Sequence, residues 1–354
     1  NLVAITYTAD SFVHVLDAHT KTILSCLSVK HITNSQIHTG SWFSDASGLY
    51  FLMVDMTGKI DGSDGGGGLH LWKVTEGDGV LMHSWSAPKA LNMSSSDVKP
   101  IASGANHRHP TRSSVFYITD AKQGGGYFVD IRDGEIHLLS HIPTSALEPC
   151  SKGGGLWVYP HPKKNNRLIG QYGKQQVDRS CIIELDVESN ALVRVLSLPS
   201  SALDAHGIGF CEASNDELFI LNTNRVSATM DIVRYNNAEI VKTIDLNDMF
   251  SDAFAPVTTG TCTSPPVNPS TKRFQPDVLS YRGKRLFQVA RGRRPLSAVL
   301  KQNWLEYAAP GLYTYHISDD CMNIYRSATD VSLEAYNDKS VLNMADPHGG
   351  ELVG

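Results

Sequence analysis

Residues 206–224 read HGIGFCEASNDELFILNTN, and this stretch shows the unit from which the chain is built. A histidine leads a first apolar run, a turn with Ser, Asn and Asp follows, and a second, strongly apolar run ends the unit. Further short runs rich in Val, Ile and Tyr, such as residues 231–236, come next and are bounded by Asn, Asp and Ser. Runs of this length and composition between turn residues predict β-strands.

The same plan recurs along the chain. It is clear in HTGSWFSDASGLYFLMVD at 38–55, in 109–142 and in 275–292, whereas 153–173 is a degenerate copy. The units start near residues 38, 109, 155, 206, 277 and 348. Regularly spaced short strands in repeated units are typical of a β-propeller. We therefore expect an all-β fold of six four-stranded blades from these starts. A seventh blade within 56–106 is the alternative.

The two ends of the chain are complementary in strand number. Residues 348–354 hold one strand, whereas residues 1–28 hold three strands without a unit start of their own. The C-terminal strand should therefore begin the blade that the N-terminal strands complete, closing one domain over residues 1–354. Such closure removes the exposed sheet edges that invite aggregation. The Gly-rich stretch 58–68 and the Pro-, Thr- and Ser-containing stretch 250–272 predict long surface loops.

The composition of the chain argues against several classes of function. The net charge of −5 argues against a nucleic-acid-binding protein, and no apolar run reaches the roughly 20 residues that cross a bilayer. Six cysteines without a CxxC pair argue against a zinc ribbon or a thioredoxin-type site. They can form disulfides or remain buried thiols, and we expect at least one disulfide. The sequon at Asn92 also favours secretion.

The C-terminal part of the chain resembles a known family. The runs QPDVLSYRGKRLFQVARGRRPLS (275–297), GLYTYHIS (311–318) and ADPHGGELV (345–353) are similar to bacterial YVTN-type, lactonase-like propellers. The resemblance implies a propeller fold and an extracytoplasmic location, whether secreted, periplasmic or lumenal. The sequence departs from the family at Tyr281-Arg282, where an acidic turn residue is usual. No set of acidic residues matches the calcium site of propeller hydrolases.

Four histidines mark the starts of units. In a propeller the first strand of each blade lines the central channel, and the starts of these strands gather at one mouth. Converging neutral imidazoles form a site for copper, zinc or iron. The predicted ligands are His38, His109, His206 and His348. Residues predicted to orient or supplement them are His107, Asp204, Asp277 and Asp346.

A structural role for these histidines is the alternative. A histidine at a strand start can also form hydrogen bonds within its own blade and bind nothing. His161, in YPHPKK, should lie at the opposite rim from the predicted ligands, in a solvated loop.

Three functions remain open after these arguments. The first is a metal-binding propeller, with redox chemistry or metal-assisted hydrolysis of a small molecule if it is an enzyme. The second is a non-catalytic scaffold that binds a protein partner through loops 58–68 and 250–272. The third is a lactonase-like hydrolase.

Overall fold

Antiparallel β-strands make up nearly all regular structure in the computed structural model of the protein. It describes residues 2–7, 11–17, 20, 22–75, 77, 79–102, 109–122, 125–148, 150, 154–173, 180–198, 205–224, 227–249, 276–282, 284–290, 311–326 and 331–332. The all-β prediction is confirmed. The chain divides into two compact units, residues 1–197 and 198–354. The prediction of one domain over 1–354 stays a prediction.

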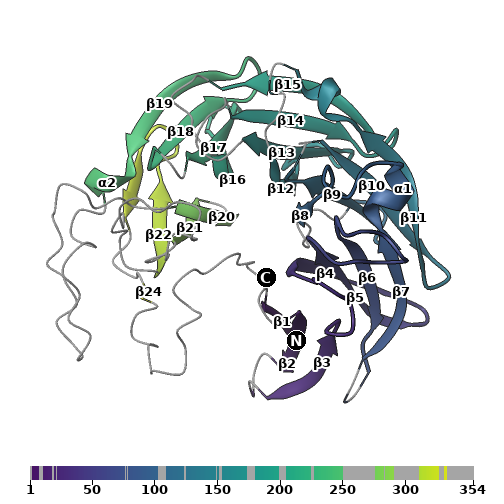
Figure 1. Ribbon diagram of the computed structural model, residues 1–354. Helices are drawn as coiled ribbons and strands as arrows, with labels where there is room; N and C mark the ends of the chain where they lie inside the picture. Colours follow the sequence, from purple (N-terminus) through teal and green to yellow (C-terminus); the bar gives the residue numbers. More distant parts are fainter. Residues whose placement is uncertain are drawn as a thin grey trace, which may run out of the picture. The chain divides into compact units, whose positions relative to one another are not determined.

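Four sheets form the first unit, and in each of them the strands pair in chain order (Figure 1). The first sheet has three strands, β1 (Leu2–Tyr7), β2 (Phe12–Asp17) and β3 (Ile23–Ser28). The second comprises β4 (Ile37–Asp45), β5 (Gly48–Asp55), β6 (Gly68–Lys73) and β7 (Val80–Ser86). The third comprises β8 (Pro100–Ala102), β9 (Val115–Asp120), β10 (Gly126–Arg132) and β11 (Glu135–Ile142). The fourth comprises β12 (Gly154–Pro160), β13 (Arg167–Gly173), β14 (Cys181–Asp186) and β15 (Ala191–Ser197).

Short helical turns connect the sheets of this unit. Helix α1 (Ala87–Leu91) lies between β7 and β8, and a 3-10 turn (Thr144–Leu147) lies between β11 and β12. The described part of 56–106, the stretch considered for a seventh blade, contains β6 and β7 of the second sheet, the connecting helix α1, and β8 of the third sheet.

The second unit has two described sheets. One comprises β16 (Ala205–Glu212), β17 (Leu218–Asn224), β18 (Thr229–Arg234) and β19 (Glu239–Asp245), and helix α2 (Leu246–Met249) follows it. The other comprises β20 (Pro276–Arg282), β21 (Arg285–Ala290), β22 (Gly311–Ile317) and β23 (Ile324–Arg326), and β24 (Val331–Ser332) also pairs with β22. The predicted loop 250–272 lies outside the described residues.

The same register irregularity recurs between the first and second strands. One residue is skipped after the first pair, which produces a bulge at the start of the first strand. The skipped residues are His38 in β4, Ile101 in β8 and His206 in β16. Three sheets therefore begin in the same way, as expected of a repeated unit.

The N-terminal sheet corresponds to the last three strands of this unit. The register shifts between Val15 and Leu16 where β2 pairs with β3, just as it shifts between Leu71 and Trp72 where β6 pairs with β7. Strands β1, β2 and β3 therefore correspond to β5, β6 and β7, and the first strand is the one not supplied by residues 2–28. The strand predicted to supply it, 348–354, lies outside the described residues.

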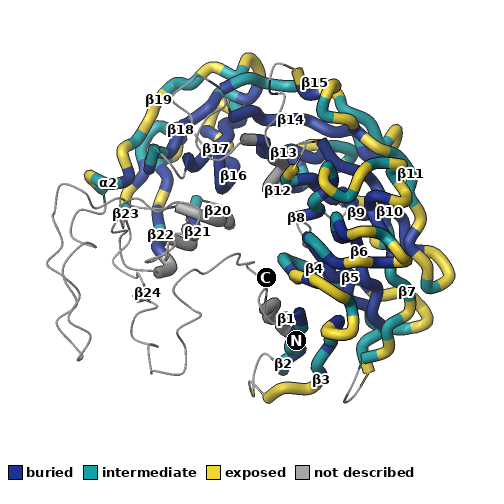
Figure 2. The backbone as a smooth tube through the Cα atoms, viewed as in Figure 1, coloured by how far each residue is buried: buried dark blue, intermediate teal, exposed yellow. Residues whose placement is uncertain are grey.

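Burial decreases from the second strand of a sheet to the fourth (Figure 2). All six residues of β9 are buried, whereas β19 has no buried residue. Strands that are buried on both faces need neighbouring sheets to cover them. Apolar side chains of successive sheets provide this cover, as where Phe43 meets Phe116 edge-on with ring centroids 5.8 Å apart.

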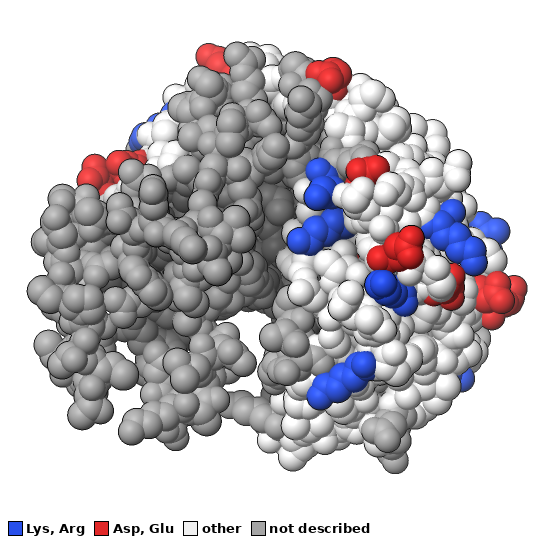
Figure 3. Space-filling view, viewed as in Figure 1, with Lys and Arg blue, Asp and Glu red and all other residues white. Residues whose placement is uncertain are grey.

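Two disulfides, Cys150–Cys181 in the first unit and Cys211–Cys321 in the second, confirm the expectation of at least one. No helix within the described residues is long and apolar enough to cross a membrane. On the face shown in Figure 3, the described Lys and Arg side chains are interspersed with Asp and Glu.

Candidate functional site

His38 and His206 occupy corresponding positions, one in each unit. Each is the skipped residue at the start of a first strand, between Ile37 and Thr39 or between Ala205 and Gly207. His206 is only 5% exposed, and His38 is half-buried. The prediction that these two histidines open equivalent strands is confirmed.

His109 does not open a first strand, and the sequence-based placement was wrong on this point. It lies in the turn between β8 and β9, where its backbone N–H donates to the Val115 carbonyl oxygen over 2.9 Å. The bulge position of this sheet belongs to Ile101. His109 therefore lies at the opposite end of its first strand from where His38 and His206 lie on theirs.

Both ring nitrogens of His109 are engaged in hydrogen bonds. Nδ1 accepts from the backbone N–H groups of Thr111, at 3.1 Å, and Arg112, at 2.9 Å. This assigns the ring proton to Nε2, which lies 2.9 Å from the Val187 carbonyl oxygen. The imidazole ties its own turn to the turn after β14. His109 therefore has the structural role that was the alternative to metal binding.

His161 corresponds to His109 in the next sheet. Its backbone N–H donates to Arg167 O over 2.9 Å, and its Nδ1 accepts from the N–H groups of Lys163 and Lys164 at 3.0 and 3.1 Å. Its position at the far end of the first strand agrees with the prediction. The predicted solvation was wrong, because His161 is 5% exposed. The shared His-Pro dipeptide at 109 and 161 was the signal that could have linked the two turns.

Both turn histidines are less basic than an ordinary histidine. Burial lowers the pKa of His109, against an opposing effect of its hydrogen bond to Val187. Burial and then the charge of Lys164 lower the pKa of His161 to about 4, while Glu184 opposes this. Both rings are therefore neutral near pH 7, as acceptance of two N–H groups at Nδ1 requires.

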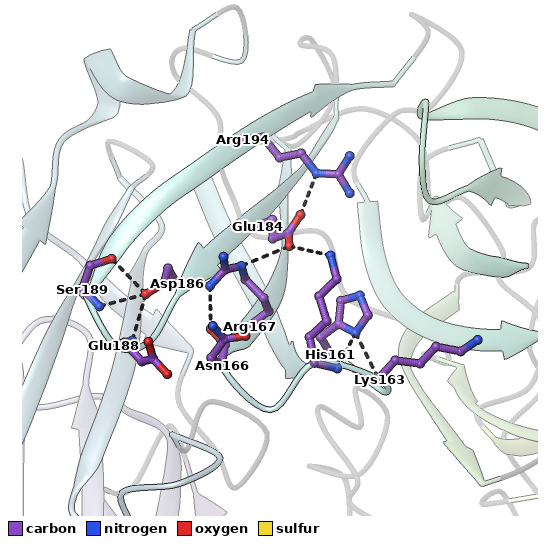
Figure 4. A network of polar contacts seen from close by, with 10 residues as sticks. His161, Lys163, Asn166, Arg167, Glu184, Asp186, Glu188, Ser189 and Arg194 are labelled. Carbon is purple, nitrogen blue, oxygen red and sulfur yellow. Dashed lines mark hydrogen bonds and ion pairs between the residues drawn. The ribbon is translucent and has the colours of Figure 1, made fainter. Parts of the chain in front are cut away.

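Beside His161 lies a network of ion pairs around one buried carboxylate (Figure 4). Glu184 on β14 pairs with Arg194 at 2.6 Å, Arg167 at 3.4 Å and Lys164 at 3.6 Å. Arg167 also pairs with Asp186. The cationic side chains come from β13, β15 and the turn after β12, so the network ties three strands together. Removing Glu184 would leave these cations close together without their shared partner.

A second kind of polar contact joins the second, third and fourth strands of a sheet. In the sheet β4–β7, His70 Nε2 lies 3.1 Å from Asp55 Oδ2, and His70 Nδ1 lies 2.9 Å from Ser84 Oγ. Asp55 Oδ1 accepts three backbone N–H groups, from Gln36, Thr57 and Gly58. Burial raises the pKa of Asp55, but the hydrogen bonds from His70 and Gln36 outweigh it, and the pKa lies below its ordinary value.

The Asp55–His70–Ser84 contact contains the residue types of a serine hydrolase triad, but its place in the sheet indicates a structural role. His70 and Asp55 are fully buried. In the sheet β16–β19 the corresponding residues are Asn224, Asp231 and Thr243. Here Asn224 Nδ2 donates to Asp231 Oδ2 over 2.7 Å and Thr243 Oγ1 donates to Asp231 Oδ1 over 2.6 Å. The polar contact lies at the same place in both sheets although the residue types differ. Its role is therefore to hold neighbouring strands together, and we call it a clamp.

These clamps were not predicted from the sequence. The signal was a polar residue at the same register position in successive strands, since His70 pairs with Ser84 and Asp231 pairs with Thr243. Burial raises the pKa of Asp231, against the hydrogen bonds of Thr243 and Asn224.

The remaining predicted site residues are not placed by the structure. His107, Asp204, Asp346 and His348 lie outside the described residues. Asp277 lies in β20, where only its backbone is described. Within the described part of the chain, no three His, Cys, Asp or Glu side chains gather as a metal site would require.

Comparison with known proteins indicates the fold. No protein-family model and no curated protein matches the chain. The periplasmic gluconolactonase of Pseudomonas aeruginosa superposes with a TM-score of 0.52 and 15% identity, over 94% of this chain and 82% of that one. A putative 6-phosphogluconolactonase of Bacteroides fragilis gives 0.51 and 13%, over 92% and 79%. The Dos1 propeller gives 0.54 and 8%, over 93% and 68%. The chain therefore has a β-propeller fold.

Proposed function

We propose that this protein is an extracytoplasmic β-propeller that hydrolyses a small lactone-like substrate at a site built from His38, His206 and His348. The observation that carries the proposal is the equivalence of His38 and His206 at the bulge that opens a first strand. His348 shares the Asp-x-His-Gly context of His206. The proposal includes closure of the sheets into one ring, with 348–354 as the missing first strand.

The donor set fits a transition metal. Neutral imidazoles suit zinc, copper and iron, and three of them leave a coordination position open in a catalytic site. His206 is almost fully buried, which would shield a bound ion from bulk water. Asp204 and Asp346 each precede a histidine of the set by two residues, and we assign them the role of accepting a ring N–H. Because both ring nitrogens of His109 are engaged, it is left out of the set.

A bound metal ion would supply polarisation of the substrate carbonyl and a more acidic water molecule. His38 and His206 each lie at a strand bulge, which fixes the position of their backbone. In lactone hydrolysis the water oxygen bonds to the carbonyl carbon, the ring C–O bond breaks, and the released alkoxide takes a proton. The substrate class is supported by the two neighbours whose names describe them as lactonases.

The location is supported by two disulfides and by the periplasmic neighbour. Disulfides persist in oxidising compartments and are rare in reducing ones.

Turnover of a sugar lactone by the purified full chain tests the proposal. We expect hydrolysis that a chelator abolishes and added zinc, copper or iron restores, with His38→Ala and His206→Ala each lowering it by on the order of 100-fold. His137→Ala is the matched control, because this β11 histidine is 45% exposed. Turnover that persists in chelator and in both variants would establish a lactonase of another mechanism and overturn the metal site.

The scaffold alternative is supported by the hydrogen bonds of the loop 58–68. In the loop 58–68, Lys59 N–H donates to the Thr33 carbonyl oxygen over 3.0 Å, and Gly67 N–H donates to Gly58 O over 3.2 Å. A loop held in this way presents a fixed surface. A metal-free, inactive protein that captures a partner would favour this reading.

A further inference from the structure

One modification motif is unused by the proposed function. Asn92-Met93-Ser94 is the single Asn-x-Ser/Thr sequence in the chain with a residue other than proline in the middle. The other candidate, Asn268-Pro-Ser, has proline there and is excluded. Asn92 follows helix α1, in the connection between the outer strand β7 and the first strand β8 of the next sheet.

The structure presents this motif to solvent. Asn92 and Ser94 are exposed, whereas Met93 between them is partly buried against the core of the second and third sheets. The two side chains that glycan transfer needs are therefore outside, and Met93 anchors the segment. Among the described residues, Asn92 makes no side-chain hydrogen bond, so its amide is not held by the fold.

The backbone conformation of Asn92 explains why an asparagine occurs at this position. It adopts the left-handed conformation, with φ 53° and ψ 48°, and its N–H caps α1 by donating to Lys89 O over 3.4 Å. Asn and Gly are the residues that favour this position. The cap explains an asparagine here, but it does not explain the serine two residues later.

Ser94 supplies the second requirement of the motif. Its hydroxyl lies 2.9 Å from Ser96 Oγ and accepts from Ser96 N–H over 3.3 Å. These are contacts within one exposed turn, and the hydroxyl stays available to an approaching enzyme. The disulfides point to the same compartment as the motif does, since both disulfide formation and glycan transfer take place in the secretory pathway.

We propose that Asn92 carries an N-linked glycan. A lipid-linked oligosaccharide pyrophosphate is the donor: the bond between sugar C1 and the pyrophosphate oxygen breaks, C1 bonds to Asn92 Nδ2, and the amide gives up one proton. The lipid pyrophosphate leaves. The inference depends on entry into the secretory pathway and is independent of the metal site.

Expression of the full chain behind a signal peptide in eukaryotic cells tests this assignment. The expected result is a single glycan on the Asn92 peptide by mass spectrometry, removed by an amidase that converts Asn92 to Asp. Ser94→Thr should keep the glycan, and Ser94→Ala should lose it while keeping the Asn92 cap. Asn92→Gly should also lose it and keep the left-handed turn.

A second measurement makes the test independent of yield. Translation with microsomes should give one band of lower mobility for the wild-type chain and for Ser94→Thr, and none for the two loss variants. An unmodified Asn92 in wild-type chain that has been translocated or secreted would overturn the proposal. Whether the unglycosylated protein hydrolyses a lactone has no bearing on the glycan result. The glycan proposal and the proposed function can therefore fail independently of each other.

Discussion

His109 Nε2 lies 2.9 Å from the carbonyl oxygen of Val187, and this contact joins the turn before β9 to the turn after β14. Residues 78 positions apart in the sequence thereby fix two neighbouring sheets. Arg112 Nη2 reaches the same carbonyl over 3.2 Å. A histidine that the sequence suggested as a metal ligand is thus part of the packing between sheets.

Replacing His109 should destabilise the fold without changing metal content. His109→Ala removes the acceptor of two backbone N–H groups and the donor to a buried carbonyl, and the expected loss is roughly 1–3 kcal/mol. Urea unfolding followed by fluorescence measures it. His137→Ala, at an exposed position, should stay within about 0.5 kcal/mol of wild type. An equal loss of unfolding free energy in both variants would contradict the structural role assigned to His109.

Acid should weaken the fold through His161. Its pKa is about 4 in the folded protein and about 6.5 in the unfolded chain. Between these values the unfolded chain binds the proton and the folded protein does not, so stability falls as the pH is lowered from 7 to 4. The loss from this residue is at most roughly 3 kcal/mol.

His161→Asn is the variant that separates this effect from other acid effects. Asparagine keeps a side-chain acceptor for the N–H groups of Lys163 and Lys164 but does not titrate. Unfolding free energies of the variant at pH 7, 6, 5 and 4 should therefore fall less steeply than those of wild type. Parallel curves would show that His161 does not contribute to the acid sensitivity.

The Cys211–Cys321 disulfide should be a strong stabilising contact of the second unit. Cys211 is paired with Phe219, five residues before the end of β17 at Asn224. His109 faces Val115, likewise five residues before the end of β9 at Asp120. The disulfide therefore occupies the place that the His109 contact has in another sheet. Double replacement by serine should cost roughly 2–5 kcal/mol, measured by thermal unfolding. A cost below that of His109→Ala would contradict this assignment.

The Asp55–His70–Ser84 clamp should matter for stability and not for turnover. Ser84→Ala removes one hydrogen bond to a buried imidazole, and the expected cost is about 1 kcal/mol by urea unfolding. Lactone hydrolysis at a temperature where the variant is folded should equal that of wild type. A large fall in the turnover number would instead assign Ser84 to the reaction.

The repeat explains which parts of the structure could be predicted from the sequence. The segments 38–55 and 206–224 read as a histidine, a strand, a turn and a strand, and the structure has these elements in both places. His109 was misplaced because the unit that it begins was aligned with the unit that begins at His38. In the structure His109 instead corresponds to His161. Only the pairing of Pro100 with Asp120 reveals where that first strand begins.

The clamps were hidden for a different reason. A buried polar contact needs complementary partners but not particular residue types, so Asp, His and Ser in one sheet become Asn, Asp and Thr in another. Pattern matching by residue type misses such a substitution. The disulfide pairs also depend on which segments meet in the folded protein, and strand propensity carries no information on that.

Metal content of the purified full chain tests the central claim most directly. By elemental analysis we expect about one equivalent of zinc, copper or iron per chain, as for a single mononuclear site. His38→Ala and His206→Ala should each lose it, while His109→Ala and His137→Ala should retain it. A folded wild-type protein that stays metal-free after incubation with each ion, or one whose metal survives loss of His206, would contradict the proposed site.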